Sequence, residues 1–494
     1  MKKTICIFLA AAIIICSFAA CGGNTPGSRD ISNDPLPPET AQTETEAPKK
    51  TLPVIRYDGE SYVIFVNDRA DDYKSLEFTA EEINGTPVND AVFERNSKIE
   101  ENFGIELDIR RISDPQLQIR KSVQSGEHEP DLVLMPLYLI GPLALEGMLC
   151  DLNSFEYIDF DSGSWDKKAA EQLSMGGALP TAVGDLNIND KDMTWCLFFN
   201  KNLAENYGLP DIYSLVKNGK WTFDKFEELI HGVTVDLNGD GLYDDNDLWG
   251  HVTVFARSAA AYTYSMGGYL VVKNPSTDYP EINIGSERIY AAYDKIRSLF
   301  FDSGECHDVE TMPFKGFAHQ WRKTESMFGS EQILFYGEAM QNAERFRGYE
   351  TDFGIIPLPT WSEGETGNNM LWTQAYSNVV PLTAGFDPSQ SERDGIILEA
   401  LQEYSTEYIR PAYYEKSLKG KYSRDEASAD MIDIIFSNRY YDIAAYYAWG
   451  GISEAFMDCG HSGSTNLKST LESLKTVTET EISDMIAKLK EIQQ

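Results

Sequence analysis

The sequence predicts an α/β protein in which mostly parallel sheets are flanked by helices. Three observations support this class. Strand-like and helix-like segments alternate from Tyr62 onward, which is the rhythm of βαβ units. Apolar residues make up 42% of the chain and aromatic residues 12%, enough to bury a sizeable core. The length of 494 residues favours two or three lobes over one.

The first elements follow from local patterns. A strand is expected at 62–67, where β-branched and aromatic residues cluster, and a helix at 91–103, where apolar residues recur at helical spacing. Residues 105–109 alternate as a second strand, and the apolar run 131–135 is typical of a buried third strand. Ligands on such sheets bind beyond the carboxyl ends of the strands. The residues that follow these ends are Asn67, Asp68 and Arg69 after the first strand, and Leu137 and Tyr138 after the third.

Longer phrases in the middle of the chain are more specific than this alternation. They are WCLFFNKNL at 195–203, NGKWTFDKF at 218–226, LFYGEAM at 334–340 and DFGIIPLP at 352–359. Thr222 is placed to cap a helix whose inner face comprises Phe226, Leu229 and Ile230.

In this order, the phrases resemble the extracellular solute-binding lipoproteins of bacterial ABC importers, in the branch related to sugar-binding members. That family has a strand ending in Asn-Lys-x-Leu, a Gly-Lys-Trp-Thr helix start, an apolar strand ending near Gly-Glu, and an Asp-Phe-Gly-Ile-x-Pro-Leu-Pro segment. The match covers about residues 190–360. It implies a two-lobed periplasmic-binding-protein-like fold, whose lobes are joined by hinge crossings and close on a solute.

The resemblance also implies lobe boundaries for this chain. Lobe one corresponds to 53–195 plus 350–385, and lobe two to 200–345 plus 390–494. The crossings between the lobes are then expected near 195–200, 341–352 and 381–391.

The N-terminus has the features of an export signal. Lys2 and Lys3 precede an apolar stretch of signal-peptide length, and Phe18-Ala19-Ala20-Cys21 resembles the bacterial lipobox, with Phe18 where that pattern usually has Leu. We expect residues 1–20 to be a lipoprotein signal peptide and 21–52 to be a lipidated Cys21 followed by a flexible, Pro-rich tether. The alternative is an ordinary secretory signal with an incidental Cys21. The expected location is the extracellular face of the cell membrane, with a fatty-acid anchor such as palmitate.

The charge of the chain limits its partners. The sequence has 78 Asp and Glu against 42 Lys and Arg, a formal net charge of −36. A phosphate backbone would be repelled, so nucleic acid is not expected as a partner. No CxxC pair occurs, so the cysteines indicate neither a zinc site nor a redox motif. Cys150, Cys196, Cys306 and Cys459 could form disulfides or remain buried thiols.

The segment 236–247 fits the EF-hand loop pattern. Calcium requires several oxygen ligands on a tight curve, and Gly241 permits the sharp turn. The expected ligands are Asp236, Asn238, Asp240, Leu242 (through its carbonyl), Asp244 and Asp247. Because Asp247 replaces the usual Glu, we expect a structural Ca²⁺ site of modest affinity. The alternative is an Asp/Asn/Gly surface turn without a metal.

Aromatic, carboxylate and arginine side chains are the candidates for solute contacts. Sugar rings stack on aromatic rings, while carboxylates, amides and Arg bind the hydroxyl groups. The candidates are Asn67, Asp68, Arg69, Tyr138, Trp195, Arg257, Tyr262, Tyr264, Tyr336, Glu338, Trp361, Trp372 and Tyr376. For each of them, core packing or a solvated surface position is the alternative.

The resemblance implies a monomeric binding protein, not an enzyme, that captures a carbohydrate and delivers it to membrane permease subunits. The aromatic content favours an oligosaccharide as the solute. The alternatives are a secreted glycan hydrolase and a surface peptide or adhesin-type binder. No HExxH, GxSxG or P-loop pattern occurs in the sequence, and with 78 carboxylates no spacing of paired acids is informative.

Overall fold

The computed structural model describes residues 51–68, 78–126, 129–382, 388–414 and 426–492. All of them belong to one compact unit, Pro48–Gln494. The predictions for the signal peptide, for Cys21, for the tether up to residue 50 and for Arg69 lie outside the described residues.

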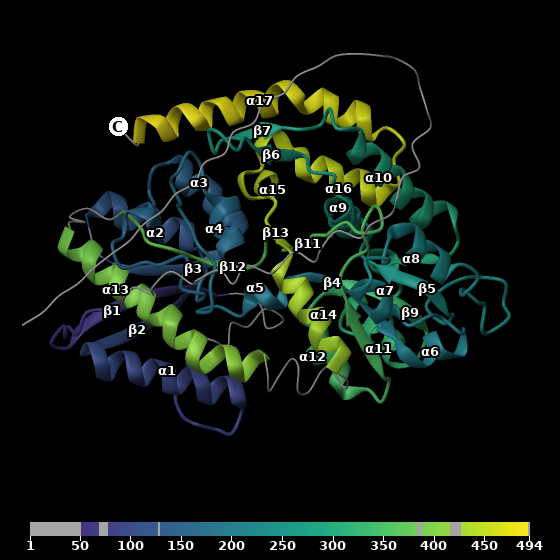
Figure 1. Cartoon of the computed structure of the whole chain (residues 1–494), viewed down its shortest axis with the longest axis horizontal. Coiled ribbons are helices and arrows are strands. Elements are labelled where there is room, and N and C mark those ends of the chain that lie inside the picture. Colours follow the sequence, from purple (N-terminus) through teal and green to yellow (C-terminus); the bar gives the residue numbers. More distant parts are fainter. Residues whose placement is uncertain (1–50, 69–77, 127–128, 383–387, 415–425, 493–494) are drawn as a thin grey trace, which may run out of the picture. The chain divides into compact units, whose positions relative to one another are not determined.

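The first of two main sheets has the strand order β12-β3-β1-β2 (Figure 1). Its strands are β1 (Glu60–Asn67), β2 (Ile105–Ile112), β3 (Leu132–Pro136) and β12 (Tyr376–Val379). β1 pairs in parallel with β2 and β3, while β12 pairs antiparallel with β3. The three strands predicted near the N-terminus are confirmed. Every residue of β3 is buried, as its apolar run indicated.

The second sheet has the order β10-β4-β9-β5-β8. Its strands are β4 (Trp195–Asn200), β5 (Trp249–Thr253), β8 (Cys306–Asp308), β9 (Ile333–Ala339) and β10 (Phe353–Ile356). β5 pairs in parallel with β8 and β9, whereas β4 pairs antiparallel with β9 and β10. Two small sheets join β6 (Val271–Lys273) to β7 (Pro280–Ile282) and β11 (Asn369–Met370) to β13 (Arg439–Tyr440).

Helices cover both main sheets. Those before β4 are α1 (Pro87–Phe103), α2 (Pro115–Ser125), α3 (Ile140–Leu145), α4 (Lys167–Leu173) and α5 (Asn189–Asp192). Those between β4 and β10 are α6 (Lys201–Asn206), α7 (Ile212–Lys217), α8 (Phe223–Ile230), α9 (Phe255–Ser265), α10 (Glu287–Arg297), α11 (Gln320–Gly329) and α12 (Asn342–Arg345). Those after β12 are α13 (Pro388–Tyr404), α14 (Glu426–Ser437), α15 (Ile443–Tyr447), α16 (Ile452–Ser462) and α17 (Leu467–Ile492).

Local sequence explains several helix ends. Gly104 ends α1 in the left-handed conformation with φ 63°, where its N–H donates to the carbonyl of Glu100. Thr222 caps α8, as predicted, because its Oγ1 accepts the N–H of Lys225 at 3.2 Å. Phe226 and Ile230 are buried on the inner face of that helix.

The strand pairings differ from the expected lobe boundaries. β10 was expected in lobe one, but it satisfies its backbone hydrogen bonds on β4 in the second sheet. The segment 341–352 therefore joins two strands of one sheet. β4 itself lies inside the second sheet, and the chain passes between the sheets just before it, where the N–H of Trp372 donates to the carbonyl of Met193 at 3.1 Å.

Helix α13 was expected in lobe two, yet it contacts α1 beside the first sheet. It buries Asp394 and Glu399 there. Glu399 accepts hydrogen bonds from Trp165 Nε1 at 2.7 Å and from the N–H of Asp159 at 3.1 Å. These acids sit in a helix with little apolar periodicity, so the sequence pattern did not indicate which face packs against lobe one.

The buried carboxyl of Asp394 is expected to make stability depend on pH. Burial, reinforced by the charge of Asp131, raises its pKa from 3.8 to about 8. The folded state therefore binds more protons than the unfolded state, and stability falls as the pH rises from about 4 to about 8. The variant Asp394→Asn has no titrating group at this position. Its free energy of unfolding, relative to that of the parent, should therefore increase as the pH rises from about 4 to about 8. Urea unfolding at pH 5 and pH 8 measures this, and Asp161→Asn, which alters an exposed acid, should show no such trend.

Two further findings concern membrane-spanning helices and the cysteine thiols. Over the ranges of the chain described above, no helix combines the length and apolar character needed to cross a bilayer. Cys150, Cys196, Cys306 and Cys459 are all buried and unpaired, which resolves the open question about disulfides in favour of free thiols.

Candidate functional site

The parallel strands of the second sheet end at one edge, where three functional segments meet. β5 is followed by α9, which carries Arg257 in its first turn. β8 ends at Asp308, and β9 carries Glu338 at its penultimate position. Because the carboxyl ends of parallel strands form the usual ligand edge of such sheets, this edge is where a solute site is expected.

A pocket of about 250 Å³ opens at this edge. Its lining residues are Arg257, His319, Trp321, Glu338, Gln341, Asn342, Arg345 and Trp372. Trp372 comes from the segment between β11 and β12, which returns the chain to the first sheet. The pocket therefore lies where the chain passes between the two sheets.

Arg257 lies between two indole rings. Its guanidinium carbon is 4.6 Å from the ring centroid of Trp372 and 5.9 Å from that of Trp321. His319 packs edge-on against Trp321, with the ring centroids 5.8 Å apart. This arrangement fixes the orientation of the aromatic surfaces and places a positive charge beside them.

Glu338 supplies the negative charge of the pocket. Its Oε1 accepts the N–H of Ala339 at 2.9 Å, and the side chain of Trp321 also donates to its carboxyl. Burial raises the pKa of Glu338, while the positive charges of Arg257 and Arg345 oppose that shift. The carboxyl is thus a fixed acceptor between two cationic groups.

Asn342 and Arg345 complete the polar lining from α12. Asn342 Nδ2 donates to the carbonyl of Ala339 at 3.1 Å, and its buried Oδ1 accepts no hydrogen bond from any described residue. Arg345 is held by Glu325 at 2.7 Å. The pocket therefore combines donors, acceptors and aromatic faces, which suits a neutral polyhydroxylated solute.

The structure brings Arg257, Glu338 and Trp372 together, out of the residues predicted from sequence. Tyr138 lies in the short helix η2 (Leu137–Leu139) that follows β3 and is 41% exposed. Its N–H donates to the carbonyl of Thr373 at 3.2 Å, next to Trp372. Asp68 is exposed at the end of β1. Asn67 is buried, and its carbonyl accepts the hydroxyl of Tyr376 at 2.7 Å.

The remaining predicted aromatics lie away from the pocket lining. Trp195 and Tyr336 are buried within the second sheet. Tyr262 donates to or accepts from His251 Nε2 at 3.1 Å, and Tyr264 donates to Asp442 at 2.6 Å, both in the core. Trp361 packs against Arg288, whose guanidinium carbon is 4.7 Å from its ring centroid.

Sequence reasoning missed several lining residues. Gln341 and Asn342 directly follow β9, so the rule about strand ends, applied to the second sheet, would have found them. His319 and Trp321 lie at the start of α11, which no strand directly precedes, and Arg345 is the last residue of α12. Nothing in their local sequence indicates the pocket.

The predicted calcium loop is a tight turn whose side chains bond its own backbone. Asp236 accepts the N–H groups of Gly239 and Gly241 at 2.7 and 2.8 Å. The buried Asp247 accepts those of Leu237 and Asp244 at 2.9 and 2.8 Å. Gly241 has φ 80°, which the sharp turn requires. Among the described residues, the loop carboxylates do not form a group with ligand atoms within 4.8 Å of one another.

A larger cavity of about 620 Å³ lies elsewhere, lined by the end of α14 and by residues of the segments 163–166, 184–191 and 406–414. Its charged residues neutralise one another. Arg439 pairs with Asp166, Lys191 pairs with Asp185 at 3.3 Å, and Arg410 pairs with Asp185 at 3.2 Å. These charges are paired within the protein, although the buried Nε of Arg439 has no hydrogen-bond partner among the described residues.

Comparison with known proteins shows the fold. No family model and no curated protein sequence matches the chain. Among solved structures, a cyclo/maltodextrin-binding protein complexed with maltotetraose matches with a TM-score of 0.56 at 13% identity, covering 86% of this chain and 98% of that one. The maltose/maltodextrin-binding domain of Bdellovibrio bacteriovorus bound to maltotriose matches with 0.52 at 16% identity, covering 86% and 100%. An ABC substrate-binding protein of Listeria monocytogenes in complex with cycloalternan matches with 0.51 at 14% identity, covering 86% and 99%. The chain thus has the two-lobed, mixed α/β fold of the ABC sugar-binding proteins, as the sequence resemblance implied.

Proposed function

We propose that this protein is the solute-binding component of an ABC importer and that it captures an oligosaccharide between its lobes. The observation that carries the proposal is the pocket formed by Trp321, Trp372, Arg257 and Glu338 at the carboxyl edge of the second sheet. The fold shared with structures that hold maltotriose, maltotetraose and cycloalternan supports it. Permease subunits in the membrane would receive the solute.

The pocket chemistry favours a carbohydrate over other solutes. Indole faces stack on the C–H faces of sugar rings, and the Glu338 carboxyl can accept hydrogen bonds from sugar hydroxyl groups. The volume of about 250 Å³ lies just below the ~300–1,000 Å³ usual for ligand sites. One end of an oligosaccharide would fill it, and the remaining rings would extend toward the exposed Tyr138.

The same lining argues against the alternative of a glycan hydrolase. Glycoside hydrolysis generally uses a pair of carboxyl groups flanking the scissile bond. Glu338 is the one carboxylate among the described residues that line the pocket. A binding protein needs no such pair.

Thermal-shift screening followed by calorimetry tests the proposal. Linear and cyclic oligosaccharides are compared with hexoses, peptides and polyamines. We expect an oligosaccharide to raise the melting temperature and to bind saturably, without being cleaved. Selective binding of a peptide or polyamine, or release of product from a glycan, would contradict the proposed function.

We propose further that the protein acts as a monomer anchored by a lipid on Cys21 at the extracellular face of the cell membrane. The lipobox-like Phe18-Ala19-Ala20-Cys21 and the Pro-rich segment that follows support this location. Metabolic labelling with a radioactive fatty acid tests it. Label should enter the parent chain, and equal label in Cys21→Ala would contradict the anchor.

For the loop 236–247, we propose a structural Ca²⁺ ion. Its support is the EF-hand pattern of the loop and the turn at Gly241. Calcium at about 100 times its dissociation constant should stabilise the fold by about 2.7 kcal/mol and raise the melting temperature. Asp240→Asn should reduce that rise.

Asp245→Asn is the matched control for the calcium prediction. Asp245 lies in the same loop but off the ligand pattern, and it pairs with Lys323 at 3.0 Å. It should leave the calcium response unchanged. An unaltered melting temperature of the parent chain in millimolar calcium would favour a plain surface turn.

A further inference from the structure

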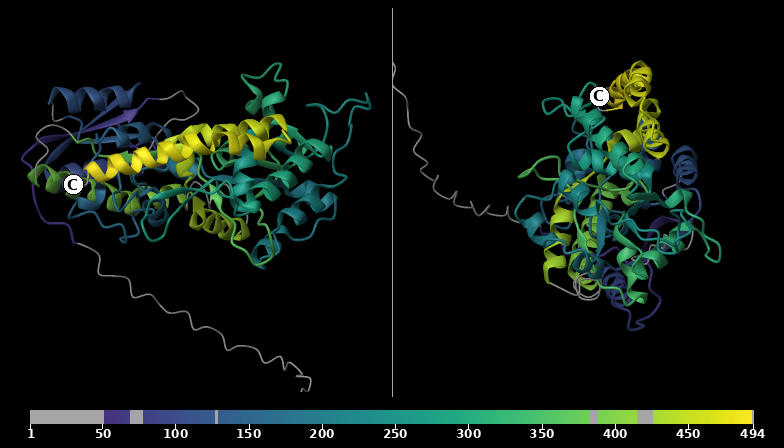
Figure 2. Two further views of the ribbon diagram at one scale, coloured as in Figure 1. Left: turned by 90° about the horizontal axis from the view of Figure 1, so that it is seen from above. Right: turned by 90° about the vertical axis from the view of Figure 1, so that its right-hand side faces the viewer.

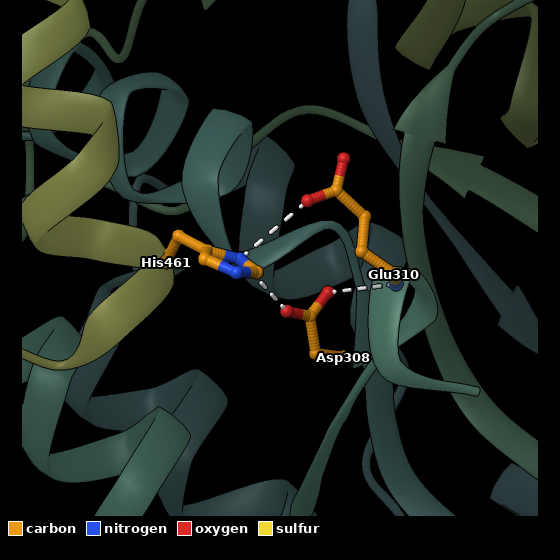
Figure 3. A group of neighbouring side chains, drawn as sticks. All are labelled: Asp308, Glu310 and His461. Atoms are coloured by element: carbon orange, nitrogen blue, oxygen red, sulfur yellow. Dashed lines mark hydrogen bonds and ion pairs between the residues drawn. The ribbon is translucent and has the colours of Figure 1, made fainter.

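A cluster of three ligand-type side chains lies beside the solute pocket, at the same edge of the second sheet (Figure 3). Asp308 ends β8, Glu310 lies in the following short helix η5 (Val309–Thr311), and His461 lies near the end of α16. One ligand atom from each lies within 4.8 Å of the other two. His461 Nδ1 is 3.5 Å from Asp308 Oδ2 and 3.5 Å from Glu310 Oε2.

We propose that Asp308, Glu310 and His461 bind a divalent transition-metal ion, with Zn²⁺ the best match to their donor atoms. An imidazole nitrogen combined with carboxylate oxygens is a donor set typical of zinc, whereas calcium and magnesium prefer oxygen ligands alone. Three protein ligands would leave a fourth position for water. No sequence spacing indicated this site, because its residues come from segments about 150 positions apart in the chain.

The distances within the cluster support a shared ion. Two ligands that each lie about 2.0–2.1 Å from one tetrahedral zinc are separated by about 3.3 Å. The two separations of 3.5 Å are close to that value. They are longer than the usual 2.7–3.2 Å of a direct nitrogen–oxygen hydrogen bond.

Neighbouring groups orient the two carboxylates toward His461. Asp308 Oδ1 accepts the N–H groups of Glu310 at 3.0 Å and Phe255 at 3.3 Å, which leaves Oδ2 facing the imidazole. Glu310 Oε1 lies 3.8 Å from Arg257 Nη2, which leaves Oε2 facing the same nitrogen. Such outer contacts are typical of groups that hold metal ligands in place.

The electrostatic balance also favours a cation here. The side chain of Asp308 is only 5% exposed, so water solvates its carboxylate poorly. Two acids converge on one imidazole, and Arg257, at 3.8 Å from Glu310, offsets part of their charge. A divalent ion between them would offset the remaining repulsion. The competing arrangement is a metal-free ion pair, in which a protonated His461 bridges both carboxylates.

Calorimetric titration of the untagged full chain with Zn²⁺, and separately with Mg²⁺, distinguishes the two arrangements. We expect one equivalent of Zn²⁺ to bind and Mg²⁺ not to compete. His461→Ala should lower the zinc affinity at least tenfold. The matched control is His231→Ala, which alters an 86% exposed histidine that also lies near a carboxylate, 3.9 Å from Glu305 Oε1. This variant should bind zinc as the parent does.

A second variant tests whether the loss of zinc binding in His461→Ala results from loss of folding. Glu310→Gln keeps the size of the side chain and removes one charged ligand, so it should also weaken zinc binding while the melting temperature of the apoprotein stays close to the parent value. Absence of zinc binding by the parent chain, or equal affinity in the parent and His461→Ala, would establish the ion pair instead. The calcium response of the 236–247 loop should be the same in all these variants.

Discussion

The substitution Trp372→Ala should weaken oligosaccharide binding by about 30-fold to 1,000-fold. Trp372 contributes an indole face to the pocket and packs at 4.6 Å on Arg257, so its removal takes away both the stacking surface and the support of the arginine. Truncating a central aromatic anchor typically costs about 2–4 kcal/mol, which corresponds to this range. Calorimetry with the tightest oligosaccharide from the screen measures the change.

Trp361→Ala is the matched control. Trp361 is also partly buried and also packs against a cation, Arg288, but it does not line the pocket. Its replacement should leave the dissociation constant within about threefold of the parent. The two variants should keep similar melting temperatures, because the Trp372 contact to Met193 uses the backbone N–H. Similar losses of affinity in both variants would show that the pocket is not the solute site.

The second large effect is expected on stability, at Arg439. This residue is 8% exposed and pairs with Asp166 and, at 2.5 Å, with the fully buried Asp190. Burial alone would raise the pKa of Asp166, but the charge of Arg439 and the hydroxyl of Tyr441 hold that pKa below its usual value. Arg439→Ala leaves these carboxylates without their main partner, which typically costs about 3–5 kcal/mol.

Urea unfolding at neutral pH measures the loss at Arg439. Because the depressed pKa of Asp166 stabilises the fold above the ordinary carboxyl pKa, the deficit of the variant should shrink as the pH falls through that range. Arg110→Ala is the control, since Arg110 pairs with Glu129 at 2.7 Å while 43% exposed. That pair should contribute about 0–1 kcal/mol. Equal losses in both variants would contradict the assigned role of the buried pair.

The fold was predictable wherever local pattern decides the structure. Alternating and apolar runs marked β1, β2 and β3, and the Thr222 cap marked the start of α8. Local pattern does not predict which strands pair with each other. β10 could pair with either sheet on local grounds, and its place beside β4 depends on contacts between residues about 150 positions apart.

The site was predictable in part, for a similar reason. Arg257 and Glu338 were singled out from their local sequence, and both lie at the carboxyl edge of the second sheet. Tyr262 and Tyr264 were predicted on the same grounds, but they lie in the core. Because almost every residue of α9 is buried, the helix has no polar face from which the sequence could show which side chains reach the pocket. Trp321 reaches the pocket only through the packing of α11, which no local pattern encodes.

The long C-terminal helix α17 has a mechanical consequence for any hinge motion (Figure 2). It contacts α16 and β7 beside the second sheet and α3 beside the first. This single helix, about 39 Å long, therefore packs against elements that accompany both main sheets. Leu489, near its end, faces Ala144 and Gly147. Opening of the lobes would break some of these apolar contacts. Full exposure of one buried leucine side chain costs about 1.5–3 kcal/mol of free energy. Under the proposed function, the helix should therefore oppose opening of the lobes, and substitutions along it should alter the apparent affinity for the solute.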